Sequence, residues 1–504
     1  MATATPPEHL DLLIVGAGLS GIGAAFHLQE RCPAKSYAIL EAREDLGGTW
    51  DLFRYPGIRS DSDMHTLGYR FKPWTEPKSI ADGASILHYL RQTAREAGID
   101  RNIRFNHRVV SAQWSTSECR WTVEAERPDT GEALTLSAGF LFVCSGYYRY
   151  DEGYSPNFPG MEQFSGQMVH PQQWPEDLEY ADKRVLVIGS GATAMTLVPA
   201  LAQKAAQVTM VQRSPTYVVS MPAEDAIANR LRRALGDQAS YAIVRWKNVL
   251  LQMGSYQLSR RRPQIMKRLL RRAVQRALPP GYDVDTHFNP SYDPWDQRLC
   301  LVPDADLFKA ISSGRAEILT DRIKTFTETG VSLESGAELD ADVIVTATGL
   351  NLLFLGGIAL SVDGEAVDAA AAMTYKGMML SGVPNFAFTL GYTNASWTLK
   401  ADLTSEYVCR LLTHMDEHGY LECVPRSTDS SLKEEPLMPL SSGYVLRAVD
   451  QLPKQGSKPP WRLRMNYALD VPALRFGRIE DGTMQFSRPL GGSREPRQDL
   501  AVSA

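Results

Sequence analysis

The stretch DLLIVGAGLSGIGAAFHLQE, residues 11–30, decides the fold of the chain. It reads as a short buried strand, a glycine-rich turn and a helix, and SYAILEA (residues 36–42) follows it as a second strand. Gly16, Gly18 and Gly21 form the pattern G-x-G-x-x-G between strand and helix. The first glycine allows a tight turn, the second lets the backbone approach a pyrophosphate at the helix N-terminus, and the third permits close helix packing. The stretch therefore predicts a βαβ unit that binds a dinucleotide.

The same order of elements returns later in the chain. KRVLVIGSGATAMTLVPALAQ (residues 183–203) is followed by QVTMVQRSPT (residues 207–216). Here Gly189, Gly191 and Ala194 form the G-x-G-x-x-A variant of the pattern. Two such units predict an α/β fold with two dinucleotide-binding, Rossmann-like domains.

The residue at the end of each second strand distinguishes the two sites. Glu41 ends the first unit about 20 residues beyond its last glycine, where a carboxylate accepts hydrogen bonds from ribose hydroxyls. Arg213, followed by Ser214, stands at the matching place in the second unit. A guanidinium holds a 2′-phosphate with paired hydrogen bonds, whereas a carboxylate repels it; the alternative for Arg213 is an ordinary surface base. The pair of sites indicates FAD in the first and NADP(H) in the second.

Length and composition are those of a soluble globular protein. The 504 residues correspond to about three globular units, with 44% apolar and 22% charged residues. The net charge of −5 is unlike that of a nucleic-acid-binding protein, which is usually basic. No export signal is visible, and no apolar run reaches the roughly 20 residues of a membrane-spanning helix. We expect a cytoplasmic protein with no transmembrane segment and no nucleic-acid partner.

The cysteine spacing bears on the chemistry. Six cysteines are scattered along the chain, with neither a C-x-x-C nor a C-x(4)-C pair. This spacing argues against a zinc site, a disulfide framework and the redox dithiol of the disulfide-reductase flavoproteins. No metal is expected. Because there is no redox dithiol to exchange electrons with a reduced flavin, we expect the flavin to react with oxygen.

The order of the units predicts a first domain that is interrupted by the second. Residues 102–148 carry short alternating stretches, which predict a small antiparallel layer, and residues 157–177 form a linker rich in Pro, Gly and Gln. The last residues, 491–504, are expected to fray. The expected domains are an FAD-binding domain in two parts, residues 1–150 and 351–504, and an NADP-binding domain, residues 151–350.

A basic helical insertion is expected within the second domain, at about residues 222–290. Residues 229–280 hold 13 Lys or Arg residues against one acid. Within them IMKRLLRRAVQRAL (residues 265–278) predicts a basic amphipathic helix. The apolar residues expected on one side of this helix, opposite the bases, are Ile265, Leu269, Val274 and Leu278. Two interpretations stay open: a solvated helical face, or peripheral contact with a membrane surface or an acidic partner.

The predicted linker resembles a signature of one protein family. Phe164, Gly166, His170 and Trp174, followed by a proline, match F-x-G-x-x-x-H-x-x-x-W-P at every fixed position. This is the signature of the Baeyer–Villiger monooxygenases, which are class B flavoprotein monooxygenases. In that family the segment links the domains and moves with NADP, so the resemblance implies a structural role for His170 rather than a catalytic one.

Further segments extend the resemblance over nearly the whole chain. GGTW (residues 47–50) and RYPGIRSDSDM (residues 54–64) are similar to the flavin-proximal loops of the family, and IVTATGL (residues 344–350) to the return from its NADP domain. The nearest form, judged by segments such as DPWDQRLC (residues 293–300), is the branch that contains the mycobacterial ethionamide-activating monooxygenase.

The resemblance also implies which residues form the site. One arginine near the flavin is essential in the family, and DPWDQRLC places this role on Arg298, with Asp61 as its paired carboxylate. Many members have a lysine before that arginine, where this chain has Gln297, so one phosphate contact is not carried over. Pattern and resemblance together assign to FAD Gly16, Gly18, Ser20, Gly21, Glu41, Gly48, Thr49, Trp50, Asp61 and Val109. They assign to NADP Arg59, Gly189, Ser190, Gly191, Ala192, Thr193, Ala194, Arg213 and Ser214.

The reaction that the resemblance implies is oxygenation. An NADPH- and O₂-dependent flavin monooxygenase would convert ketones to esters or lactones through a C4a-peroxyflavin, and would oxidise thioethers as well. The alternatives are a flavin monooxygenase acting mainly on nitrogen or sulfur, and an NADPH oxidase-like flavoprotein that transfers no oxygen. Residues 373–397, rich in Met and aromatic residues, predict either an apolar substrate wall around Trp397 or Met378, or ordinary core.

Overall fold

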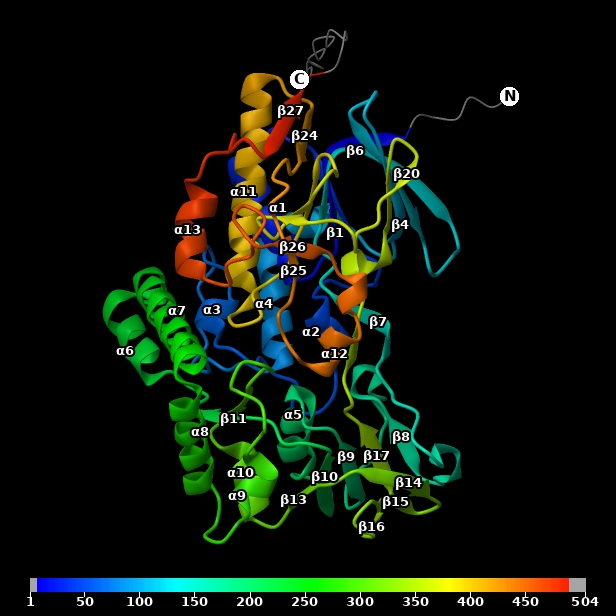
Figure 1. Cartoon of the computed structure of the whole chain (residues 1–504), viewed down its shortest axis with the longest axis vertical. Coiled ribbons are helices and arrows are strands. Elements are labelled where there is room, and N and C mark those ends of the chain that lie inside the picture. The colour runs from blue at the N-terminus through cyan, green and yellow to red at the C-terminus, as the bar shows by residue number, and fades with distance from the viewer. Residues whose placement is uncertain (1–6, 489–504) are drawn as a thin grey trace.

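Two principal sheets, each containing one of the glycine turns, organise the protein (Figure 1). The structure is a computed structural model that describes residues 7–488. The tail expected to fray, residues 491–504, lies outside the described residues. The predicted α/β fold with two dinucleotide-binding units is confirmed by the sheets described next.

The first sheet places the first glycine turn at a carboxyl edge. β1 (Glu8–Val15) pairs in parallel with β2 (Tyr37–Leu40) and with β6 (Ala133–Val143), and β2 pairs with β3 (Ile103–Arg104). The predicted antiparallel layer is present, because β6 continues into pairing with β5 (Arg120–Glu126), and β5 with β4 (Arg108–Ser115). Strands from late in the chain complete this sheet: β19 (Ala359–Val362), β20 (Glu365–Ala366) and β23 (Phe386–Phe388).

The second sheet is parallel throughout and carries the second turn between β9 and α5 (Ala192–Leu201). Its buried strands are rich in Val and Ile, as expected for a sheet covered on both faces. In order they are β13 (Ala316–Thr320), β10 (Gln207–Gln212), β9 (Arg184–Ile188), β17 (Val343–Thr346) and β8 (Gln167–Val169). A small antiparallel sheet accompanies it: β14 (Ile323–Thr327), β15 (Gly330–Leu333) and β16 (Glu338–Asp340).

The two chain connections between these sheets run side by side. β7 (Tyr148–Gly153) leaves the first sheet and β18 (Leu350–Leu352) returns to it, and the two strands pair antiparallel. All strands of the second sheet lie between them in the sequence. We propose that the domain boundaries fall at this ribbon, near residues 150 and 350.

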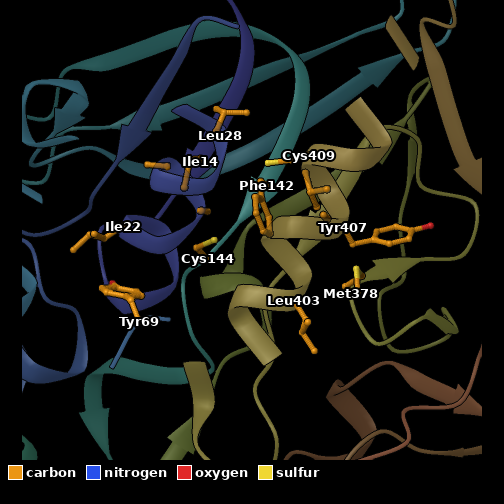
Figure 2. Close-up of a cluster of buried hydrophobic side chains, with 14 of the residues drawn as sticks. Ile14, Ile22, Leu28, Tyr69, Phe142, Cys144, Met378, Leu403, Tyr407 and Cys409 are labelled. Carbon is orange, nitrogen blue, oxygen red and sulfur yellow. The ribbon is translucent and has the colours of Figure 1, made fainter. Parts of the chain in front are cut away.

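The core of the first unit lies between two helices that are far apart in the sequence. α1 (Leu19–Arg31) packs against α11 (Trp397–His418), and Figure 2 shows side chains of both helices meeting around Phe142 of β6. Met378 is fully buried in this cluster, so it belongs to the core and not to a substrate wall. At about 25 cal/mol per Å² of apolar area, such burial is the main term that stabilises the unit.

The basic insertion is helical, as predicted, and its first two helices project at the left of Figure 1. It consists of α6 (Ala226–Leu235), α7 (Asp237–Arg261), α8 (Pro263–Ala277) and α9 (Val284–Phe288).

One prediction for α8 is wrong. Val274 and Leu278 are buried, but Ile265 and Leu269 are 44% and 49% exposed. The buried residues within the helix are Met266 and Val274. Ile265 precedes Val274 by nine residues, or two and a half helical turns, so these two side chains point to opposite sides of the helix.

The other elements connect or cover these parts. The remaining helices are α2 (Thr49–Leu52), α3 (Met64–Leu67), α4 (Gly83–Glu96), α10 (Asp306–Ser312), α12 (Gly443–Leu446) and α13 (Tyr467–Arg475). The remaining strands form two-stranded pairs: β11 (Val218–Met221) with β12 (Cys300–Pro303), β21 (Thr374–Tyr375) with β22 (Met379–Leu380), β24 (Glu422–Pro425) with β27 (Met484–Ser487), and β25 (Glu434–Pro436) with β26 (Lys454–Gly456). Within residues 7–488, none of the helices combines the length and apolar character needed to span a bilayer.

Candidate active site

One cavity of about 2190 Å³ joins the two glycine turns. Ligands of open α/β sheets bind beyond the carboxyl ends of the strands, and both turns lie at such ends. The predicted residues that line the cavity are Gly16, Gly18, Ser20, Glu41, Gly48, Thr49, Trp50, Arg59, Asp61, Val109, Gly189, Ser190, Gly191, Ala192, Thr193, Arg213, Ser214 and Arg298. Gly21 and Ala194 do not line it, because each sits in the first turn of its helix and faces inward.

The first turn has no room for side chains. Gly16 has φ +101°, and a Cβ there would lie 2.8 Å from the Cys144 carbonyl oxygen. A Cβ on Gly21 would lie 1.8 Å from the carbonyl oxygen of Gly16. Gly18 faces Gly48, whose Cα would lie 3.6 Å from an added Cβ. Because Gly18 caps α1 without a side-chain hydrogen bond, the first N–H groups of the helix are free to bind an anion.

Glu41 is tied to this turn by its own carboxylate. Its Oε2 accepts a hydrogen bond from the Ala17 backbone N–H at 2.7 Å, and its Oε1 accepts one from Arg43 N–H at 3.0 Å. Burial raises the pKa of the Glu41 carboxyl, while these two backbone bonds oppose the shift. Each oxygen keeps a further lone pair, so Glu41 can accept from ribose hydroxyls as well.

The second glycine turn has the same backbone design as the first but leaves more space around its middle glycine. Gly189 has φ +133°, and a Cβ there would lie 2.2 Å from the Ala347 carbonyl oxygen, whereas nothing lies within 4 Å of a Cβ on Gly191. The Ser190 hydroxyl donates to the Ser214 carbonyl at 3.0 Å, which joins the turn to the end of β10. Arg213 is exposed, lines the cavity and has no acidic partner within residues 7–488, so its guanidinium is free to bind a phosphate.

Arg298 and Asp61 meet between the two turns. The Arg298 Nη1 group donates to Asp61 Oδ2 at 2.9 Å, and the two side chains are 33% and 53% exposed. The guanidinium also faces the phenols of Tyr147, Tyr148 and Tyr444. Burial raises the pKa of Tyr148 to about 12, so this phenol stays neutral at physiological pH. A fixed positive charge is thus held in a wall of neutral hydroxyl groups.

Two donors near Arg298 have no partner in the protein. The Nε of Arg298 itself and the Nε1 of Trp295 are buried and without hydrogen bonds in the described structure. Trp295 lines the cavity and has φ +73°, a left-handed conformation that costs a bulky residue about 1–3 kcal/mol. Unpaired buried donors of this kind fit a ligand rich in oxygen acceptors.

The two aspartates of the R-S-D-S-D loop have different partners. Asp63 caps α3 by accepting from the Thr66 N–H at 3.1 Å, and it also accepts from Asn248 and Gln252 of α7, at 2.8 and 3.0 Å. Only Asp61 therefore contacts Arg298, in the pairing that the resemblance implied, while Asp63 attaches the loop to the helical insertion.

A buried arginine strengthens that attachment. Arg245 of α7, one of the basic residues counted in the insertion, is 4% exposed. Its Nη1 donates to the carbonyl oxygens of His65, Thr66 and Gly68, at 2.8, 3.2 and 2.7 Å. The insertion is thus fixed to the loop that carries Asp61, and this part of its positive charge is structural.

Arg59 contacts a protein carboxylate in this structure. It forms an ion pair with Asp306 in the first turn of α10, while its Nε is buried and unpaired. Arg59 lines the cavity. To bind NADP as well, it would have to use guanidinium N–H groups that do not already donate to Asp306.

Three tyrosines of the site were missed in the sequence. Tyr147, Tyr148 and Tyr150 line the cavity, and the Tyr150 hydroxyl lies 3.3 Å from Thr49 Oγ1. The signal was present, because GYYRY directly follows the buried strand β6, at the carboxyl end where ligands bind. Tyr444, in contrast, enters the site from the short helix α12, whose sequence has no recognisable pattern.

The linker residues lie outside the cavity. His170 donates from Nε2 to the Gly349 carbonyl at 3.1 Å and accepts from the Gln172 N–H at Nδ1, at 3.2 Å. Its ring occupies the place of a side chain on Gly153, where a Cβ would lie 1.9 Å from the ring. Gly153 belongs to β7 and Gly349 precedes β18, so His170 packs on the connecting ribbon. Phe164 and Gly166 pack together, and Trp174 lies against Tyr180.

Two family profiles match different parts of this chain. The family profile described as flavin-binding monooxygenase-like matches residues 79–367, more than half of the chain, and a profile for an NAD(P)-binding Rossmann-like domain matches residues 14–75. Over 488 residues the chain is 59% identical to the FAD-containing monooxygenase EthA of Mycobacterium tuberculosis (strain H37Rv), covering 96% of this chain and 99% of EthA. The chain belongs to the flavin-binding monooxygenase-like family.

Other relatives and solved structures agree with this membership. The monooxygenase is 48% identical over 483 residues to the probable FAD-binding monooxygenase AlmA of Acinetobacter baylyi, covering 95% of this chain and 97% of AlmA. An oxidised steroid monooxygenase bound to NADP superposes with a TM-score of 0.75 at 22% identity, over 95% of this chain and all of that one. An open form of cyclohexanone monooxygenase gives a TM-score of 0.74 at 19% identity. These two likenesses show the shared fold.

The residues of the monooxygenase fit two dinucleotides. Gly18 and Gly48 face each other across a passage that a side chain on either residue would narrow. Glu41 also lines the cavity, where its carboxylate can accept hydrogen bonds from a ribose. The second turn offers free helix N–H groups and the unpaired Arg213. Because both turns open into one cavity, two bound dinucleotides would meet near Arg298.

Proposed function

We propose that the protein is an FAD-containing, NADPH-dependent monooxygenase that converts ketones to esters or lactones and also oxidises thioethers. The observation that carries this proposal is the Arg298–Asp61 pair, at 2.9 Å, between two nucleotide turns in one cavity. The name of the 59% identical relative, FAD-containing monooxygenase, supports the flavin. Ketones as substrates rest on the linker signature and on the Arg298 site.

FAD would be held by Gly16, Gly18, Gly48 and Glu41, and NADP(H) by Gly189, Gly191, Arg213 and Ser214. When bound, these cofactors supply hydride transfer and the activation of oxygen. The protein supplies binding, orientation and charge. The unpaired Arg213 selects the 2′-phosphate, because a guanidinium binds it with charge-assisted hydrogen bonds.

Arg298 stabilises negative charge that develops on oxygen when a ketone carbonyl is attacked. Asp61 accepts from one guanidinium nitrogen and fixes its direction, which leaves the Nε–H and the second terminal nitrogen for the substrate. Donors held in place before the reaction are worth about 2.7–4 kcal/mol of barrier when one of them is removed. Tyr147 and Tyr148, whose pKa values burial raises, add neutral donors and no competing charge.

Trp397 forms part of the wall of the cavity. Its indole N–H donates to Ser20 Oγ at 2.8 Å, and its ring stacks on Tyr147 with centroids 5.2 Å apart. Of the two residues considered for an apolar substrate wall, only Trp397 lines the cavity, and we assign to it the exclusion of water beside Arg298.

The decisive experiment separates flavin reduction from oxygen transfer. Arg298→Ala protein, loaded with FAD, should still lose its flavin absorbance when NADPH is added, but ester formation from 2-octanone should fall at least 100-fold, in line with about 2.7–4 kcal/mol. Arg298→Lys should keep part of the rate, because it keeps the charge. Arg149→Ala, which removes an arginine paired only with the exposed Glu152, should match the wild type. Normal ester formation by Arg298→Ala would refute the assignment.

Feeding a thioether in parallel separates the alternatives. Sulfoxide without ester would show that the enzyme acts mainly on soft heteroatoms. Consumption of NADPH with stoichiometric hydrogen peroxide and no product from either substrate would show an oxidase. Both products, each depending on NADPH, are the expected result.

A further inference from the structure

A cluster of metal-binding side chains lies at the far end of α11 from the cavity. His414, Glu417 and His418 occupy the last turns of the helix, and their potential ligand atoms lie within 4.8 Å of one another. None of the three lines the cavity. They form the single group of this kind within residues 7–488, and the cysteine spacing gives no sign of it because it holds no thiol.

The hydrogen bonds of the two histidines leave one lone pair free on each ring. His418 Nδ1 lies 2.9 Å from the His414 carbonyl oxygen, which can only accept, so Nδ1 carries the proton and Nε2 the lone pair. His414 Nε2 lies 3.1 Å from Glu480 Oε1 and donates to this carboxylate, which leaves Nδ1 with a lone pair. Metal-binding histidines typically donate their second N–H to a carbonyl or a carboxylate in this way, which fixes tautomer and orientation.

The rings are also held in place by packing. His414 and His418 lie one helical turn apart with centroids 4.2 Å from each other. His418 stacks on Tyr420 with an interplanar angle of 5°, and Tyr420 stacks in turn on Phe486 of β27. The geometry of the two imidazoles is therefore set before any ion binds.

The charges around the cluster favour a cation. Glu417 is exposed and has no hydrogen bond or ion pair to any of residues 7–488, so its carboxylate is available as a ligand. The C-terminus of a helix also carries a partial negative charge. The opposing group is Arg488, whose guanidinium lies over the Tyr420 ring and donates to the His418 carbonyl. Glu480 balances this positive charge.

We propose that His414, Glu417 and His418 form a binding site for one Zn²⁺ ion on the surface of the protein. Two imidazole nitrogens and a carboxylate oxygen are the donor set that zinc prefers in the absence of thiolates, with water in the fourth position. Glu480, from the loop between α13 and β27, is a positioning residue that acts through His414. A bound ion would thereby stabilise the joining of α11 to that loop.

The test uses full-length, tag-free holoenzyme with bound FAD, stripped of metals by a chelator that is then removed. Calorimetric titration with zinc chloride should give one site per chain, and the ion should raise the melting temperature. The double variant His414→Ala/His418→Ala should lose both effects, and Glu480→Gln should bind zinc at least tenfold more weakly. His88→Ala, at an exposed histidine on α4, should behave as the wild type.

The outcomes separate the site from ordinary surface binding. Flavin content and NADPH oxidation of each variant confirm that it is folded, and neither should change. Cobalt bound in place of zinc should show the strong visible absorption of a four-coordinate ion, which the double variant should lack. The proposal is overturned if the wild type binds no zinc, or if the double variant binds it as tightly as the wild type.

Discussion

The two nucleotide turns use the same backbone design but differ in how tightly they close. In the first, Gly21 packs so closely that a Cβ would lie 1.8 Å from the Gly16 carbonyl oxygen, whereas the second has Ala194 at the matching position. Gly18 faces Gly48, while nothing lies within 4 Å of a Cβ on Gly191. A closed turn suits a dinucleotide that stays bound, and an open turn suits one that is exchanged in each catalytic cycle.

The turns differ also in the charge that follows them. Glu41 is buried and bonded to the backbone of its own turn, whereas Arg213 is exposed and unpaired within residues 7–488. On the proposed function, the acid accepts hydrogen bonds from ribose hydroxyls and the base binds a phosphate. The comparison then teaches that two turns of one design can differ in cofactor through one side chain at the end of the next strand.

The largest effect is expected where the first turn is tightest. Gly21→Ala places a methyl group against a backbone carbonyl that cannot move without opening the turn, which costs about 3 kcal/mol. Bound flavin should weaken about 100-fold, measured as FAD content after dialysis. Gly191→Ala, a change in the open turn at the glycine that corresponds to Gly18, should retain FAD fully. Equal loss of flavin in both variants would contradict the difference in closure.

The second-largest effect is expected when the positive charge at the second turn is removed. Arg213→Ala removes charge-assisted bonds worth about 1.5–3 kcal/mol, so the KM for NADPH should rise about 10- to 100-fold. The KM for NADH, which has no 2′-phosphate, should change less than twofold. If both KM values rise together, Arg213 acts on the turn itself and does not select the phosphate.

A smaller effect is expected from the residue beside Arg298. Gln297 lines the cavity at the position where the resemblance to the Baeyer–Villiger monooxygenases implies a lysine. Gln297→Lys adds an exposed cation worth up to about 1 kcal/mol, so the KM for NADPH should fall up to fivefold, with NADH as the control. An unchanged ratio of the two KM values would place this side chain out of reach of the phosphate.

The smallest effect concerns the linker between the turns. Burial lowers the pKa of His170, while its bond to Gly349 opposes the shift. The unfolded chain takes up this proton near pH 6.5, and the folded protein only at lower pH. The free energy of unfolding should therefore decrease as the pH falls below about 6.5. Urea denaturation at pH 7.5 and 5.5 should show this decrease diminished in His170→Asn, and an equal decrease in both proteins would contradict it.

Most of the fold and part of the site follow from the sequence. The glycine turns and their strands are local patterns whose geometry depends on few neighbours. Arg298 and Asp61, 237 residues apart, could be paired only through a resemblance, because no local pattern joins them.

The failures have a common physical cause in tertiary contacts. Ile265 and Leu269 fit an apolar stripe as well as Met266 does, and only the packing of α8 decides which stripe is buried. In the sequence Arg245 is one base among many, yet its guanidinium donates to three carbonyl groups at the end of α3, far away in the sequence. Tyr444 reaches the site from the short helix α12, whose position depends on the rest of the chain.

The paired strands β7 and β18 have a consequence for protein engineering. Because the segment between them leaves and re-enters the first unit at one hydrogen-bonded ribbon, its two ends are held at a fixed, short separation. An exchange of this segment between relatives therefore needs only two neighbouring splice points, with Gly153, His170 and Gly349 carried over as one set. Arg298 lies within this segment and Asp61 outside it, so every such exchange has to re-form the 2.9 Å ion pair between the two parts.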